Sequence, residues 1–173
     1  MRSRDEVWNM KSRESLAYLS LGSNVGDREA QLDAAVTRLS AAGRVTAISS
    51  FYETEPVEFT EQPRFLNCAV ALETGQTPAQ LMAQILGIEQ KMGRTRTQNK
   101  GPRAIDIDIL LFGNDIVNSR NVTIPHPAMH ERRFVLEPLA EIAPEAEHPL
   151  LHKTIRVLRD ALPPGQTVRR ISR

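Results

Sequence analysis

The order of strand-like and helix-like segments predicts an α+β fold with helices packed on one antiparallel sheet. Short apolar runs typical of strands cover residues 16–21, 45–54, 65–74 and the second half of 101–113. Segments with apolar residues at helical spacing follow the predicted N-caps Asp27 and Thr77, and Gly43 and Gly93 end them. Gln80 is expected to complete a capping box with Thr77. This β-α-β-β-α-β order is that of ferredoxin-like domains. Further helices are expected over 134–143 and 150–162 as C-terminal additions.

Length and composition indicate one globular domain. The chain has 173 residues, 40% hydrophobic and 25% charged, which is ordinary for a protein with a single core. A net charge of +1 gives no global argument for nucleic acid or a membrane surface, and the lone Cys68 fits a reducing compartment. We expect one domain over 15–162, a flexible extension over 1–14 and a disordered basic tail over 163–173.

The stretch 101–113, GPRAIDIDILLFG, carries the strongest chemical signal. Side chains alternate along a strand, so Asp106 and Asp108 share one face about 6–7 Å apart. The opposite face is predicted to be core, with Ile105, Ile107, Ile109 and Leu111. Paired carboxylates suit a hard cation such as Mg²⁺, and nearby cations suit phosphate. Those cations are Arg94, Arg96, Lys100 and Arg103. Taken alone, the Asp pair is more often just the outer face of a half-exposed strand, and the neighbouring cations are what favour the metal site.

Two other segments point to turns and to a recognition surface. Residues 22–27, GSNVGD, are expected to form a tight turn through both glycines, with Asp27 capping the following helix. The strand over 65–74 places Phe65 and Asn67 on one face, followed by Ala69 and Ala71, which would leave room above them. The alternative is that Phe65 is a core residue and Asn67 a satisfied polar group at a strand end.

Several motifs together resemble the hydroxymethyldihydropterin pyrophosphokinase family of folate synthesis. They run in matching order from about residue 17 to about residue 143: LSLGSNVGDR, SSFYET, QPRFLNCAVALET, GPRAIDIDILLFG and PHPAMHERRFVLEPL. The resemblance implies pyrophosphate transfer from ATP to the hydroxymethyl group of a reduced pterin, with release of AMP. It also implies a ferredoxin-like fold, two Mg²⁺ ions, a cytoplasmic location and a monomer or weak homodimer, without nucleic acid or membrane partners.

The resemblance also assigns roles to individual residues. Asp106 and Asp108 would hold Mg²⁺, and with Arg94 and Arg103 they form the implied catalytic set. The implied ATP-binding residues are Arg94, Arg96, Arg103, His126 and Arg132. The implied pterin-binding residues are Thr54, Val57, Phe65, Asn67 and Phe134. Phe65 and Phe134 would sandwich the ring, and Asn67 would bind its amide-like edge.

The chain departs from the family pattern around the nucleotide. Lys100 stands where many members have Trp, and Pro127 follows the histidine where some have an aromatic residue. Two other function classes remain open at this point. One is a catalytically silent ferredoxin-like module that binds RNA or a metabolite, although an RNA-binding sheet needs exposed aromatic residues and this chain has few. The other is a different Mg²⁺-dependent nucleotidyl or phosphoryl transferase.

Overall fold

The fold is built on one antiparallel sheet. A computed structural model describes residues 14–54, 63–93 and 104–172. Within these residues the sheet has six strands in the order β10-β3-β4-β1-β5, and β2 also pairs with β4. Every pairing in it is antiparallel. The strands are β1 (Ser15–Ser23), β2 (Arg44–Ile48), β3 (Tyr52–Thr54), β4 (Phe65–Thr74), β5 (Asp106–Phe112) and β10 (Val168–Arg170).

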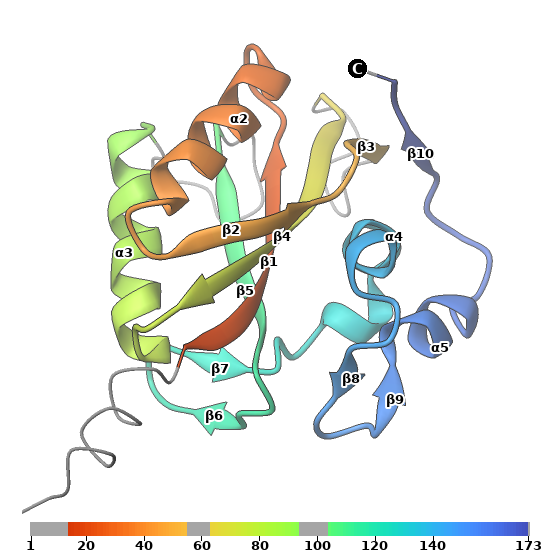
Figure 1. The fold of residues 1–173 in the computed structure, drawn as a ribbon. Helices are drawn as coiled ribbons and strands as arrows, with labels where there is room; N and C mark the ends of the chain where they lie inside the picture. The colour runs from red at the N-terminus through yellow and green to blue at the C-terminus, as the bar shows by residue number, and fades with distance from the viewer. Residues whose placement is uncertain (1–13, 55–62, 94–103, 173) are drawn as a thin grey trace, which may run out of the picture.

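Helices cover both faces of the sheet (Figure 1). On one face lie α2 (Arg28–Leu39) and α3 (Pro78–Lys91), which enclose the larger core with alternate residues of β1, β4 and β5. On the other face lie the 3-10 turn η1 (Met129–Glu131), α4 (Arg133–Ile142) and α5 (Ile155–Asp160), which enclose a second core around Ala69, Leu110 and Leu111. The α+β prediction with an antiparallel sheet is confirmed.

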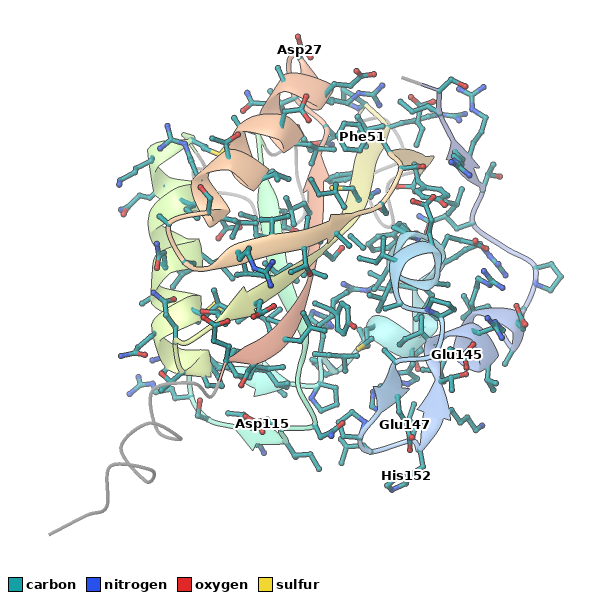
Figure 2. The ribbon with its side chains drawn as sticks, viewed as in Figure 1. Asp27, Phe51, Asp115, Glu145, Glu147 and His152 are labelled. Carbon is teal, nitrogen blue, oxygen red and sulfur yellow. The ribbon has the colours of Figure 1, made fainter. Side chains whose placement is uncertain are left out.

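The first two helices begin as their sequences predict. The side chain of Asp27, labelled at the start of α2 in Figure 2, accepts a hydrogen bond from the Ala30 N–H. Thr77 and Gln80 form a reciprocal capping box at the start of α3. Each cap satisfies backbone donors that the first helical turn leaves unpaired.

The predicted strand over 45–54 is wrong as a single element, because it is divided into β2 and β3. At the break, the Ser49 N–H donates to the Ala69 carbonyl. The Ala69 N–H donates to the Ser49 hydroxyl at 2.8 Å, where a regular ladder would use a backbone carbonyl. The next N–H, that of Ser50, donates to the carboxylate of Glu141 on α4. Side-chain partners at consecutive residues therefore interrupt the strand.

The predicted faces of β5 are correct only as far as Ile109. Tyr18 pairs with Leu111 but Leu19 pairs with Ile109, so Leu110 is an extra residue, a β-bulge. The bulge reverses the alternation, and Leu111 therefore enters the second core while Phe112 enters the first. Sequence alternation alone cannot place a bulge, because the extra residue is defined by the partner strand.

The C-terminal part of the chain differs most from expectation. Two short hairpins precede and follow η1 and α4: β6 (Val117–Asn118) with β7 (Thr123–Ile124), and β8 (Glu147–His148) with β9 (Lys153–Thr154). The helix expected over 150–162 is only Ile155–Asp160, because the second hairpin occupies its first residues. The prediction of a disordered tail over 163–173 is also wrong, because β10 within it pairs with β3. In the described residues, no helix is long and apolar enough to cross a membrane.

Candidate active site

The strand register places Asn67, Gly22 and Asp106 in one row across the sheet. Asn67 on β4 pairs with Gly22 on β1, and Gly22 pairs on its other side with Asp106 on β5. Residues directly opposite each other in a sheet share a face. The backbones of Asn67 and Asp106 are thus two strand spacings apart, about 10 Å. The predicted pterin and metal positions therefore lie side by side, although they are far apart in the sequence.

Gly22 makes this row possible by lacking a side chain. A Cβ atom at Gly22 would lie 2.6 Å from Asn67 Oδ1 and 3.7 Å from Phe65 Cδ1. Gly22 lies within β1, so its prediction as a turn residue is wrong; Gly26, with φ of +66°, is the residue that uses the glycine conformation in that turn. The glycine is needed here for the close approach of Asn67.

Asn67 is held in a fixed orientation. Its side chain is buried, and Nδ2 donates to Thr54 Oγ1 at 2.7 Å. Phe65 lies next to them, opposite Thr54 on β3, and is only partly buried. The expected room above Ala69 and Ala71 is not present, because both are buried and Ala69 packs in the core beneath α4. Any space for a ligand on this face is limited to the Phe65 end of β4.

Asp106 and Asp108 lie on the same face of the sheet as Asn67, and both are partly exposed. Asp108 is opposite Ser20 on β1. Two carboxylates on one strand face supply the oxygen ligands that Mg²⁺ prefers and leave other positions for phosphate oxygens. Among the residues that the structure describes, no group of three or more His, Cys, Asp or Glu side chains could hold a metal. The pair could supply two of the ligands of an ion whose other positions are filled by phosphate oxygens.

A buried carboxylate supports the Asp strand from behind. Glu89, near the end of α3, is 3% exposed, and its Oε2 accepts a hydrogen bond of 3.0 Å from the Ile107 N–H. This amide lies between the two Asp residues on β5, which ends the sheet path in the described chain. The bond fixes the strand against α3. Glu89 was not predicted from the sequence, although an acidic residue on the apolar side of a predicted helix was a usable signal.

His126 is brought to the Asp strand by the bulge. The backbone N–H of His126 donates to the Leu110 carbonyl at 3.0 Å, and its ring Nδ1 accepts from the Ala128 N–H. Burial lowers the pKa of His126, the positive charge of Arg132 lowers it further, and Asp106 acts in the opposite direction. Arg132 and Asp106 therefore both lie within electrostatic reach of His126. With Nδ1 accepting, the neutral ring carries its hydrogen on Nε2 and can donate it to a phosphate oxygen.

Phe134 and Arg132 lie together at the start of α4. The Arg132 guanidinium carbon is 5.6 Å from the centroid of the Phe134 ring, a cation–π arrangement. Phe134 is partly buried against the second core, on the face of the sheet that carries Phe65 and Asn67. The two predicted aromatic residues thus come from different elements to the same face.

A further cluster, which was not predicted from the sequence, lies at the end of β3 and just before β4. Arg28, at the start of α2, forms an ion pair of 2.8 Å with Glu53 and donates to the Arg64 carbonyl. Asn24 donates to the Pro63 carbonyl. The turn before α2 and the first residue of α2 are therefore attached to β3 and to the residues that lead into β4.

Four of the predicted site residues lie outside the described residues: Val57, Arg94, Arg96 and Arg103. The structure does describe the ends of the segment that holds the arginines. Gly93, with φ of +85°, ends α3, and β5 begins at Asp106.

The sequence model of the 7,8-dihydro-6-hydroxymethylpterin-pyrophosphokinase family matches residues 18–144, which contain every site residue described above. The chain belongs to this pyrophosphokinase family. A relative from Bacillus subtilis named 2-amino-4-hydroxy-6-hydroxymethyldihydropteridine pyrophosphokinase is 47% identical over 135 residues, covering 77% of this chain and 81% of that protein. A relative of the same name from Methylorubrum extorquens is 48% identical over 131 residues, 75% and 83% of the two chains.

Other members of the pyrophosphokinase family are parts of longer proteins. The folic acid synthesis protein fol1 of Schizosaccharomyces pombe is 42% identical over 154 residues, which are 88% of this chain but only 21% of that protein. The chain thus spans about a fifth of the length of that relative. A crystal structure of Plasmodium falciparum HPPK-DHPS with pteroate has a TM-score of 0.70 at 18% identity, covering 86% of this chain and 42% of that one. This likeness supports the same fold.

Proposed function

We propose that this chain transfers the pyrophosphoryl group of ATP to the hydroxymethyl group of 6-hydroxymethyl-7,8-dihydropterin, releasing AMP, in folate synthesis. It is an ATP-dependent pyrophosphokinase. The observation that carries this proposal is the row Asn67–Gly22–Asp106, which puts the backbone of the fixed Asn67 about 10 Å from that of Asp106, with both side chains on one sheet face. A flat, hydrogen-bonding acceptor and a polyphosphate donor can then lie next to each other.

The acceptor side is proposed to consist of Phe65, Phe134 and Asn67. Aromatic faces suit a flat heterocycle, and a few fixed polar groups set its orientation. Asn67 has one N–H committed to Thr54, which leaves its second N–H and its carbonyl oxygen as a donor–acceptor pair for the pterin edge. Thr54 acts by holding Asn67, and Val57 belongs to the adjoining segment that we propose contacts the ring.

The donor side is proposed to consist of Asp106, Asp108, His126 and Arg132, with Arg94, Arg96 and Arg103 neutralising phosphate charge. The pyrophosphokinase family uses ATP and Mg²⁺, and Asp106 and Asp108 would hold that metal, with two ions proposed. When bound, Mg²⁺ supplies charge neutralisation at the phosphates. His126 can donate from Nε2, and guanidinium groups suit multidentate phosphate binding.

The chemistry is an in-line displacement at the β-phosphorus. The hydroxymethyl oxygen of the pterin forms a bond to this phosphorus, the bond to the oxygen bridging to the α-phosphorus breaks, and AMP leaves. The hydroxyl proton is released. The chain contributes mainly by positioning the two substrates and by balancing the negative charge, which are the main terms in phosphoryl transfer.

The test is a product assay. ATP and 6-hydroxymethyl-7,8-dihydropterin are incubated with Mg²⁺ and the chain, and nucleotide products are separated. AMP formed in equal amount to pterin pyrophosphate supports the proposal; ADP would indicate a phosphoryl transferase, and free pyrophosphate a nucleotidyl transferase. The 6-methyl pterin, which lacks the acceptor oxygen, is the matched control and must give no AMP. No pterin-dependent nucleotide turnover would favour a silent binding module.

We also infer the finer architecture. The order β5-β1-β4 followed by β2 and β3, with α2 and α3 on one face, supports a ferredoxin-like fold. We propose that 15–162 form one pyrophosphokinase domain, to whose sheet β10 is added, and that 1–14 are an extension. A monomer or weak homodimer in the cytoplasm completes the proposal.

A further inference from the structure

Strand β10 is an addition to the sheet that lies outside the residues matched by the family model, 18–144. It pairs antiparallel with β3, so that Val168 is opposite Thr54, Arg169 is opposite Glu53 and Arg170 is opposite Tyr52 (Figure 1). β3 has only three residues, and its last one, Thr54, holds Asn67. β3 therefore pairs over its whole length with β10 on one side and with β4 on the other.

The attachment of β10 continues past the strand itself. The Ile171 N–H donates to the Phe51 carbonyl at 2.9 Å, and the Ile171 side chain packs against the larger core. Phe51, labelled in Figure 2, is 1% exposed and directly precedes β3. The backbone of β10 is therefore bonded to a residue that is itself fixed in the core.

On the α2 side of the sheet, Arg169 lies 3.4 Å from Glu53 Oε1. Glu53 also pairs with Arg28 and lies 4.0 Å from Arg64. The hydrogen bond from Arg28, together with these positive charges, lowers the pKa of Glu53. One carboxylate thus joins β10, the start of α2 and the residues that border 55–62.

On the opposite side, Arg170 lies 3.8 Å from Glu141 of α4. Glu141 also accepts hydrogen bonds from the Tyr52 hydroxyl, at 2.9 Å, and from the Ser50 N–H. Burial and the Glu141 carboxylate raise the pKa of Tyr52 to about 12, so the hydroxyl stays a donor. β10 and β3 are thereby joined to the helix that carries Phe134.

We propose that β10 is a positioning element for pterin recognition: it fixes β3 between α2 and α4 and thereby sets Thr54 and Asn67 in place. This inference rests on the proposed pyrophosphokinase function. The ion pairs of Arg169 and Arg170 are mostly exposed, at 70% and 67% for the arginine side chains, and exposed pairs contribute little. The backbone ladder is therefore the part that fixes β3.

The ladder allows a matched pair of proline variants. Because Ile171 N–H bonds to Phe51, alternation along an antiparallel pair puts the Arg169 N–H toward β3 and the Val168 N–H away from it. Arg169→Pro removes a ladder bond, whereas Val168→Pro introduces the same ring where no ladder donor is lost. Arg169→Ala removes the side chain and keeps the N–H.

The experiment measures kcat and the KM of each substrate for the full chain and these variants, with circular dichroism to establish folding. We expect Arg169→Pro to raise the pterin KM by about fivefold or more, the effect of misplacing one buried polar group. The ATP KM should stay within about twofold of wild type, a difference well under 1 kcal/mol. Val168→Pro and Arg169→Ala should resemble wild type. If Arg169→Pro does not fold, Ile171→Gly, which only loosens the attachment, must shift the pterin KM in the same direction.

Three results would overturn the inference. Equal pterin KM values for Arg169→Pro and Val168→Pro would mean that β10 only covers a sheet edge. A parallel rise in both KM values with a lower melting temperature would indicate general loosening. A wild-type chain that forms no AMP from ATP and pterin would refute the proposed function and this inference together, whereas an active wild type with unaffected variants refutes the inference alone.

Discussion

The substitution Gly22→Ala tests the arrangement of the site most directly. The new Cβ would lie 2.6 Å from Asn67 Oδ1, a distance that real Cβ contacts essentially never show. Asn67 cannot move sideways, because on the far side its Nδ2 is already 2.7 Å from Thr54 Oγ1. The carboxamide must therefore rotate and give up its bond to Thr54. Both residues are buried, at 4% and 1% exposure, so no water replaces the lost partner.

The expected cost follows from that geometry. An unsatisfied buried polar group costs about 1–3 kcal/mol, which corresponds to about a 5- to 150-fold loss of pterin affinity if the recognition edge is displaced. ATP affinity should change little, because the clash lies on the Asn67 side of the row. Titration calorimetry with pterin and with a non-hydrolysable ATP analogue measures both.

A control with the same chemical change is available in α3. A Cβ at Gly87 would meet nothing within 4 Å, so Gly87→Ala should bind both ligands as wild type does. It should also stabilise the fold by about 0.4–1 kcal/mol through the unfolded state. Wild-type pterin affinity in Gly22→Ala, or an equal loss for ATP, would refute the assignment of Asn67 and Gly22 to the pterin position.

Three further predictions concern the metal strand and the C-terminal hairpin. Asp106→Asn and Asp108→Asn should each lower turnover by about 10³-fold or more while the chain stays folded, and near-normal turnover of both at saturating Mg²⁺ would contradict the metal assignment. Glu89→Leu should lower the free energy of unfolding in urea by about 1–3 kcal/mol, because a buried backbone amide of β5 loses its acceptor, and Glu89→Gln should lower it less. The pKa of His148 is lowered, chiefly because the ring is buried. In the unfolded chain the imidazole is protonated at a higher pH than in the fold. The free energy of unfolding should therefore fall as pH drops from about 6.5 through the lowered pKa of His148. His148→Gln should flatten that decline relative to wild type in unfolding curves recorded across this pH range, and equal slopes would contradict the prediction.

The sequence by itself determined the features that depend on neighbours along the chain. The caps at Asp27 and Thr77, the strand Phe65–Thr74 and the separation of the Asp pair from the core isoleucines were all predicted, and the structure confirms them. Caps and alternation are set by backbone geometry over a few residues, so local patterns suffice. The motifs also led to the family that the comparisons establish.

Only the tertiary structure decided the features that depend on a partner strand or helix. The bulge at Leu110 exists because of its register with β1, and it supplies the carbonyl that holds His126. Gly22 acquires its role from the approach of Asn67, which lies 45 positions away in the sequence numbering. β10 joins β3 through pairing across more than a hundred residues. Such contacts are fixed by packing in three dimensions, and no periodicity within a single segment encodes them.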